Sequence, residues 1–326
     1  MSFLCIAIGM RLVQSSHLSS LMDPWTMKKP LLLCCLMASI CTGSALSGEK
    51  PLQLAAIKPD SRSGQAETPN PWKSLNPQQL RLASESALVV DSKGNEVYAK
   101  QIDEPQPIAS ITKLMTAMVV LDAALAPDER ITITRDDRDL IRYSGSRLQF
   151  GATLTRDQLL RLALMASENR AANALARTYP GGHKAFVQAM NKKASAIGMT
   201  SSRFADPAGL DSGNVATARD MVKMVRAAQK YPLIREATTT ATMSVYPYKG
   251  KGELRFNNTN RLLKNDAWKI QLSKTGYINE AGRCLVMQAS ITDQPLVIVL
   301  LNSFGKLTPF GDSNRIRKWI ENGARG

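Results

Sequence analysis

The stretch ASITKLMTAMVVLDAAL, residues 109–125, joins a polar start to a long apolar run. Most of its residues from Ile111 onward are apolar, and a helix that is apolar on all sides belongs at the centre of a fold. Pro105 and Pro107 break the chain just before it, and Ser110 offers good helix-start chemistry. The stretch therefore predicts a buried central helix that begins near Ser110.

Ser110 and Lys113 stand at positions i and i+3, which lie on one face of a helix. Burial of the lysine would lower its pKa, so that the neutral amine can accept the proton of the serine hydroxyl. The helix N-terminus would favour the negative charge that develops there. The alternative is a capping serine beside a lysine whose amine reaches water. This segment alone favours neither interpretation.

Two further motifs follow in chain order. Ser167 and Asn169 occupy a tight corner between two expected helices, where both side chains can point to one place; the alternative is a helix N-cap. Lys274-Thr275-Gly276 follows a strand-like run and can hold a carboxylate near the backbone; the alternative is an edge strand entering a turn. Ser-x-x-Lys and Ser-x-Asn each occur three times. No single motif therefore predicts a site. The prediction rests on the order of the three motifs and on their positions at a helix start, at a corner between helices and after a strand.

The remaining pattern places strands at both ends of this region and helices in its middle. Thr155 and Gln158 form a capping box that should start one of these helices. We expect a hairpin over 87–99, strands over 131–134, 268–272, 283–290 and 295–301, and helices over 159–164, 171–177, 217–229 and 315–320. This order favours an α+β fold with an antiparallel sheet.

The N-terminal region has the three parts of a secretory signal. A short basic segment follows Met27, then comes the mostly apolar run 31–40, then a few small residues. We expect a signal peptide over 1–45, with Met27 as the possible true start, a flexible tether over 46–74 and one folded domain over 75–326. An uncleaved membrane anchor is the alternative, although the apolar run is far shorter than the roughly 18 residues that span a bilayer.

The net charge and the composition limit the classes of partner and of catalytic site that the sequence allows. The formal net charge of +15 suits an anionic polymer, a membrane surface or nucleic acid. The signal peptide and the aromatic share of 6% weigh against nucleic acid. Cleavage would leave Cys284, expected in the core, and His183, expected on the surface, as the only residues of their types. A zinc site with several histidines is thereby excluded, and a Ser-His-Asp triad is disfavoured.

The motifs together resemble a known family. ASITKLM at 109–115, SEN at 167–169, DPAGL at 206–210 and KTG at 274–276 are similar to motifs of the serine-type D-alanyl-D-alanine carboxypeptidases and endopeptidases, the low-molecular-mass penicillin-binding proteins. Within that family the chain looks most like the endopeptidase type of penicillin-binding protein 7. The resemblance implies a β-lactamase/transpeptidase-like fold, in which an antiparallel sheet packs against helices with a mostly helical subdomain.

The resemblance also implies catalytic roles. Ser110 would attack the carbonyl carbon of a D-Ala residue and form an acyl-enzyme. Lys113 would accept the proton of Ser110, and Ser167 would relay a proton toward the leaving amine. The backbone N–H groups of Ser110 and Tyr277 would form the oxyanion hole. No metal and no cofactor are implied.

The binding residues implied by the resemblance come from the second and third motifs. Asn169 would bond the substrate amide, and Lys274, Thr275 and Gly276 would hold a substrate carboxylate. Many relatives carry Gly or Ala where this chain has Glu168. An acidic group there can adjust substrate choice or pair with a nearby arginine, and the sequence does not decide between these roles.

The expected activity is hydrolysis of the D-Ala–diaminopimelate cross-links of peptidoglycan, with β-lactams as covalent inhibitors. The carboxypeptidase relatives continue after the catalytic domain into a second β domain and an amphipathic membrane-binding helix. We expect neither segment in this chain, and this expectation favours the endopeptidase type. We expect a periplasmic enzyme, loosely attached to membrane or wall at most, without a stable transmembrane anchor and without nucleic acid. The alternatives are a D-Ala-D-Ala carboxypeptidase, a serine β-lactamase, for which the sequence lacks a Glu-x-x-Leu-Asn loop, and a non-catalytic wall-binding protein.

Overall fold

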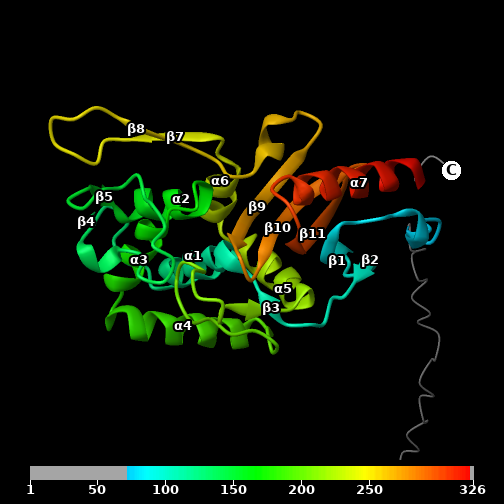
Figure 1. The fold of residues 1–326 in the computed structure, drawn as a ribbon, viewed down its shortest axis with the longest axis horizontal. Coiled ribbons are helices and arrows are strands. Elements are labelled where there is room, and N and C mark those ends of the chain that lie inside the picture. The colour runs from blue at the N-terminus through cyan, green and yellow to red at the C-terminus, as the bar shows by residue number, and fades with distance from the viewer. Residues whose placement is uncertain (1–71, 324–326) are drawn as a thin grey trace, which may run out of the picture. The chain divides into compact units, whose positions relative to one another are not determined.

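The computed structural model describes residues 72–323, drawn in colour in Figure 1. The expected signal peptide and most of the expected tether lie outside the described residues. A five-stranded antiparallel sheet has the order β2-β1-β11-β10-β9. Its strands are β1 Ser84–Asp91, β2 Glu96–Lys100, β9 Lys269–Ile278, β10 Gly282–Ile291 and β11 Gln294–Ser303.

Helices cover the two faces of this sheet unequally. The C-terminal helix lies along one face, while the others belong to a mostly helical region on the opposite side (Figure 1). The helices are α1 Lys113–Asp122, α2 Arg156–Met165, α3 Asn169–Arg177, α4 Gly182–Ala196, α5 Ala218–Ala228, α6 Pro232–Thr239 and α7 Thr308–Gly323. The expected α+β architecture is confirmed.

Side chains of the strands alternate between two cores. Val297, Val299 and Leu301 of β11 join the larger core around α1, whereas Ile298 and Leu300 join the smaller core beneath α7. This alternation follows from the period of two of a β-strand. The sheet is buried on both sides as a result, and its outer strand β9 is left with one edge free of strand partners among the described residues.

Short strand pairs complete the helical region and its connections. These pairs are β3 Gln106–Pro107 with β6 Val215–Ala216, β4 Arg130–Thr132 with β5 Thr153–Thr155, and β7 Thr242–Val245 with β8 Leu254–Asn257. Figure 1 shows the β7–β8 hairpin extending over α2. None of the described helices combines the length and the apolar character needed to cross a bilayer.

The segment that precedes β1 is fixed to the smaller core. The indole N–H of Trp72 donates to Asp91, with 2.8 Å between Nε1 and Oδ2. The indole N–H of Trp319 in α7 donates to the carbonyl oxygen of Asn76 at 3.0 Å. The chain is therefore already packed against the domain at Trp72, before the first strand of the sheet.

Several elements differ from the sequence-based expectations in extent. The expected strand over 268–272 continues to Ile278, so the Lys-Thr-Gly motif lies within β9. The expected C-terminal helix begins at Thr308 instead of Arg315. The central helix has a 3-10 turn, Ala109–Thr112, as its first turn. Helices α4 and α6 and the β7–β8 pair were not expected.

Candidate active site

Ser110 lies in the 3-10 turn that leads directly into α1. Its neighbour Ala109 has a φ of 48°, a left-handed conformation that is unfavourable for any residue with a Cβ atom. The loop at Gly209 packs onto this turn so closely that a Cβ atom on Gly209 would lie 1.9 Å from the Ala109 carbonyl oxygen. Only glycine fits there, and the loop thereby supports the strained turn that presents Ser110.

Lys113 is fully buried beneath Ser110. Its Nζ lies 2.8 Å from the Ser110 Oγ, 2.8 Å from the Asn169 Oδ1 and 2.6 Å from the Ala208 carbonyl oxygen. Burial lowers the pKa of Lys113 to about 8, although the carboxylates of Asp206, Glu168 and Asp139 act in the opposite direction. A substantial fraction of this amine is therefore neutral near physiological pH.

The carbonyl oxygen that faces Lys113 is positioned by Asp206. The Asp206 Oδ1 accepts the backbone N–H groups of Ala208 at 2.5 Å and Gly209 at 2.6 Å, while its Oδ2 accepts from Asn214 Nδ2 at 2.9 Å. These bonds close the loop into a compact turn. The DPAGL segment thus supplies a backbone acceptor to the site, which side-chain motifs cannot reveal.

Ser167 and Lys274 form the second pair of the site. Ser167 lies between α2 and α3 with a φ of 59°, a strained conformation of the kind that clusters at functional sites. The Lys274 Nζ is 2.9 Å from the Ser167 Oγ and 2.9 Å from the Thr275 carbonyl oxygen. Lys274 is 1% exposed. Burial, and then the charge of Lys113, hold the pKa of Lys274 well below its ordinary value.

Asn169 is held at both ends of its amide. Its Oδ1 accepts from Lys113, and its Nδ2 donates to the Ser144 Oγ at 2.9 Å. The backbone N–H of Ser144 in turn donates to the Asp139 Oδ2 at 2.9 Å. Sequence motifs did not indicate Ser144 or Asp139, because the loop that carries them has no pattern of its own.

Glu168 is hydrogen-bonded to the loop that precedes β5. Its side chain is 8% exposed and accepts a hydrogen bond from the Ser146 hydroxyl. Burial raises the pKa of Glu168 above its ordinary value. The structure therefore gives this residue a hydrogen-bonding role in the loop that also contains Ser144.

The third motif brings the free edge of the sheet to the nucleophile. A Cβ atom on Gly276 would lie 2.8 Å from the Ile108 carbonyl oxygen and 3.1 Å from the Ser110 backbone nitrogen. Glycine thus lets β9 run directly beside the turn that carries Ser110. The Thr275 hydroxyl lies 2.6 Å from the Thr259 hydroxyl, and Tyr277 follows at the exposed end of the motif.

A cleft of about 380 Å³ joins these elements. Of the residues predicted for the site, those that line it are Ser110, Ser167, Asn169, Thr275, Gly276 and Tyr277. Lys113 and Lys274 lie buried behind Ser110 and Ser167, so the four side chains that the hypothesis needs together do converge. Three cationic residues that sequence reasoning missed also line the cleft: Arg261, Arg283 and Lys306.

His183 and Cys284 are the only histidine and cysteine among residues 72–323. His183 lies half-buried in the first turn of α4 and does not line the cleft. Cys284 is 2% exposed, and burial raises the pKa of its thiol to about 12. Within residues 72–323, no group of three or more His, Cys, Asp or Glu side chains could hold a metal ion. The arrangement at Ser110 is a hydroxyl within 2.8 Å of a fully buried amine.

Comparisons with known proteins agree with this geometry. A family model described as D-alanyl-D-alanine carboxypeptidase matches residues 73–305. A D-alanyl-D-alanine endopeptidase of Pseudomonas aeruginosa is 48% identical over 254 residues, which cover 78% of this chain and 82% of that protein. The protein of the same name from Escherichia coli is 48% identical over 250 residues, covering 75% and 79%.

Solved structures show the same fold. The DD-transpeptidase of Streptomyces K15 superimposes with a TM-score of 0.69 at 27% identity, over 74% of this chain and 98% of that one. A D-alanyl-D-alanine carboxypeptidase from Mycobacterium tuberculosis gives a TM-score of 0.67 at 28% identity, over 74% and 92%. The expected transpeptidase-like fold is confirmed. Because the matched region contains all three motifs and the relatives are similar over most of their length, the chain belongs to the D-alanyl-D-alanine carboxypeptidase family of serine peptidases.

Proposed function

We propose that this enzyme hydrolyses the D-Ala–diaminopimelate cross-links of peptidoglycan through an acyl-enzyme on Ser110. The observation that carries the proposal is the environment of Lys113. A neutral amine has two N–H groups and one lone pair. Asn169 Oδ1 and the Ala208 carbonyl oxygen accept the two N–H groups, so the lone pair is left for the hydroxyl of Ser110 at 2.8 Å.

Acylation follows from this hydrogen-bond arrangement. The Ser110 Oγ attacks the D-Ala carbonyl carbon while its proton passes to the Lys113 Nζ. The developing oxyanion accepts hydrogen bonds from the backbone N–H groups of Ser110 and Tyr277. The close approach of Gly276 to the Ser110 nitrogen supports this role. Asn169 bonds the substrate amide from the other side of the cleft.

Breakdown of the tetrahedral intermediate requires a proton on the leaving amine. The proton that Lys113 took from Ser110 passes to the leaving nitrogen through the hydroxyl of Ser167, which lines the cleft 2.9 Å from the Lys274 Nζ, and Lys113 is neutral again. The C–N bond then breaks and the new amine departs. In the second half of the cycle Lys113 takes a proton from water and the hydroxide oxygen bonds to the acyl carbon. The bond between the acyl carbon and the Ser110 Oγ then breaks, and the Oγ takes the proton back from Lys113.

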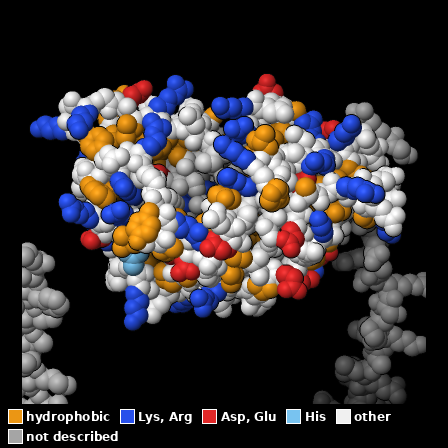
Figure 2. Space-filling view, in the orientation of Figure 1, with side chains coloured by type: hydrophobic (Ala, Val, Ile, Leu, Met, Phe, Trp, Pro, Cys, Tyr) orange, Lys and Arg blue, Asp and Glu red, His pale blue; other side chains and the backbone are white. Residues whose placement is uncertain are grey.

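Carboxylate binding is divided between Thr275 and Lys274. Thr275 lines the cleft, and its hydroxyl can bind a substrate carboxylate by exchanging the 2.6 Å hydrogen bond that it makes with the Thr259 hydroxyl. Lys274 is buried behind Ser167 and its pKa is lowered by that burial, so it adds a positive field to the cleft only while it is protonated. Figure 2 shows Lys and Arg side chains spread over one face of the enzyme with fewer Asp and Glu, which suits a polymer rich in carboxylates.

The same arrangement should accept β-lactams, since acylation of Ser110 by a strained amide needs the same nucleophile and base. Peptidoglycan as substrate places the working enzyme in the periplasm, in agreement with the signal-like N-terminal sequence. The relatives from P. aeruginosa and E. coli, both named endopeptidases, favour the cross-link over a terminal D-Ala as the bond cleaved.

Digestion of purified murein tests this proposal. The enzyme should convert cross-linked muropeptide dimers to monomers, and Ser110→Ala should abolish both this conversion and covalent labelling by a fluorescent penicillin. Dimers that persist while pentapeptide stems lose D-Ala would instead identify a carboxypeptidase. Rapid loss of the penicillin label would indicate a β-lactamase. Wall binding without any labelling would indicate a non-catalytic protein.

A further inference from the structure

The catalytic cleft does not end at Tyr277. A second cavity of about 520 Å³ adjoins it and continues along the ends of β10 and β11. The two cavities share Tyr277, Arg283 and Lys306 in their walls. The two cavities, together called the groove below, therefore adjoin at these residues, with Ser110 lining the first and Phe304 lining the second.

The register of the sheet builds the junction between the two cavities. Arg283 of β10 is the direct partner of Tyr277 of β9, so both side chains project from the same face of the sheet. The Arg283 Cζ lies 3.6 Å from the centre of the Tyr277 ring. Stacking of this kind fixes the guanidinium plane and leaves its N–H groups available to a ligand.

The far part of the groove combines positive charge with an unpacked aromatic ring. Lys306 is exposed, and the Phe304 side chain is 93% exposed. Glu85 is the only carboxylate that lines this second cavity, and it already accepts a hydrogen bond from the Asn302 side chain. Arg283 and Lys306 therefore give this part of the groove a net positive charge. The residues that break the bond at Ser110 do not require this charge.

We propose that this second cavity is a subsite for one peptide stem of a cross-linked substrate. Arg283 and Lys306 bind a free carboxylate of that stem, and Phe304 packs against its aliphatic part. The inference rests on the proposed endopeptidase function and adds to it the feature that selects a cross-link. A small substrate fills only the cavity beside Ser110, whereas a cross-linked dimer carries a stem on each side of the cleaved bond and needs the additional room.

The chemistry of the stem matches the wall of the groove. Peptide stems carry free carboxylates on flexible chains, and arginine and lysine are the residues that bind carboxylates through charge-assisted hydrogen bonds. The stacked Arg283 is already ordered, so little further freedom is lost when it binds. Reversal of the Lys306 charge places a repulsive group at the same position, which changes specificity more than simple truncation does.

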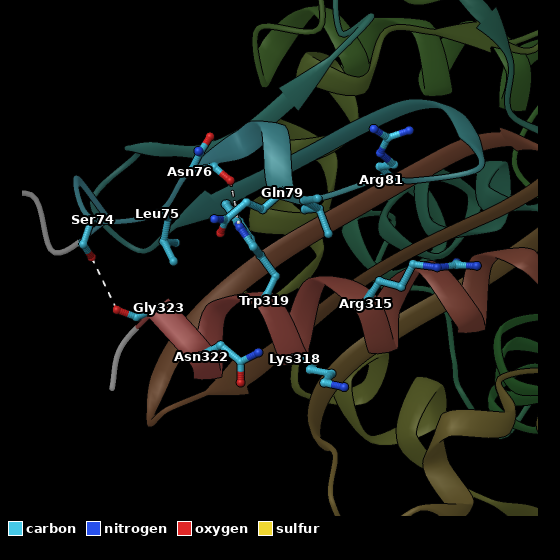
Figure 3. A pocket seen from close by; sticks show the side chains of 11 residues that line it. Ser74, Leu75, Asn76, Gln79, Arg81, Arg315, Lys318, Trp319, Asn322 and Gly323 are labelled. Carbon is cyan, nitrogen blue, oxygen red and sulfur yellow. Dashed lines mark hydrogen bonds between the residues drawn. The ribbon is translucent and has the colours of Figure 1, made fainter. Parts of the chain in front are cut away.

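A matched pair of charge reversals tests the subsite. Lys306→Glu should reduce kcat/KM for purified muropeptide dimers about tenfold and should slow acylation by penicillin less than that, because Lys306 also lines the catalytic cleft whereas only the dimer extends into the second cavity. Lys318→Glu is the control: Lys318 is also exposed, but it lines a separate cavity beside α7 that shares no residue with the groove (Figure 3). It should leave both rates unchanged.

A second measurement isolates the carboxylate. Wild-type enzyme should cleave dimers with free stem carboxylates faster than dimers in which these groups are amidated, and Lys306→Glu should remove or reverse that preference. Phe304→Ala, a change at an exposed side chain, should reduce dimer cleavage severalfold without a change in penicillin acylation. The subsite is refuted if wild type shows no preference for free carboxylates, or if Lys306→Glu behaves as Lys318→Glu does. Wild-type enzyme that leaves all dimers intact refutes the proposed function itself, and the subsite with it.

Discussion

Two hollows of similar size differ sharply in how deeply their cationic side chains are buried. The catalytic cleft measures about 380 Å³, and a hollow of about 490 Å³ lies between residues 74–81 and α7. Figure 3 shows Arg81, Arg315 and Lys318 around the latter, and all three residues are exposed. In the cleft, by contrast, the amines of Lys113 and Lys274 are buried behind hydroxyl groups.

The difference shows what marks a reactive site. Arg315 pairs with Asp312, a fully buried carboxylate that also accepts the backbone N–H and the hydroxyl of Ser84. These contacts fasten the first residue of β1 to α7. A surface cation stays charged and holds structure together, whereas a buried amine next to a hydroxyl is driven toward its neutral, basic form. The size of a hollow therefore says less than the burial of its ionisable groups.

Removal of the buried amine should give the largest effect on acylation. Lys113→Met keeps a side chain of similar length but has no base, and we expect acylation by fluorescent penicillin to slow about a thousandfold. Loss of a buried charge site should not unfold the enzyme, so the thermal unfolding midpoint provides the control. Acylation within tenfold of wild type would assign the base to another group.

The next largest effect should come from pH. Because the pKa of Lys113 is lowered to about 8, the rate constant for penicillin acylation should fall about tenfold for each pH unit below 8. Stability responds to the same group: its unfavourable buried charge is fully present below about pH 8 and disappears as pH rises toward 10.5, where the unfolded amine also becomes neutral. An acylation rate independent of pH between 6 and about 8 would contradict a neutral lysine as base.

The features that the sequence predicted correctly are those with a local cause. The capping box of Thr155 and Gln158 starts α2 as expected, because both of its hydrogen bonds lie within one turn. The apolar run after Ser110 forms the buried helix α1 for a similar reason. Helix α4 was missed because it begins at Gly182, after a left-handed Gly181, without a side-chain cap, and such a start looks like a turn.

The site was predictable only where it depends on side chains in known motifs. The Ala208 carbonyl oxygen is a backbone atom, and only the folded loop brings it within 2.6 Å of Lys113. Ser144 reaches Asn169 from a loop without periodicity. Arg283 meets Tyr277 through the register of two strands, which composition and spacing do not fix. Long-range placement thus decided what local patterns could not.

A smaller effect on acylation should follow from a change at Glu168, which supports the loop that holds Asn169 in place. Glu168→Ala removes the acceptor of the Ser146 hydroxyl and loosens the loop whose Ser144 holds the Asn169 amide. We expect acylation to slow about tenfold. Glu168→Gln keeps an acceptor and should restore most of the rate with an unchanged pH profile. Equal rates for Glu168→Ala and wild type would show that Asn169 is oriented without this loop.

The smallest effect on acylation should come from a change in the hollow between residues 74–81 and α7, even where the change in stability is large. Trp319 is 8% exposed, packs edge-on against Tyr98 at 6.0 Å and donates to Asn76. Trp319→Ala should lower the free energy of unfolding by about 3–5 kcal/mol, measured by urea denaturation. Acylation measured well below the unfolding transition should match wild type, because the chemistry depends on the buried lysines across the sheet. A parallel loss of acylation would mean that the two regions are coupled, and burial of the amines alone would then not account for the reactivity of Ser110.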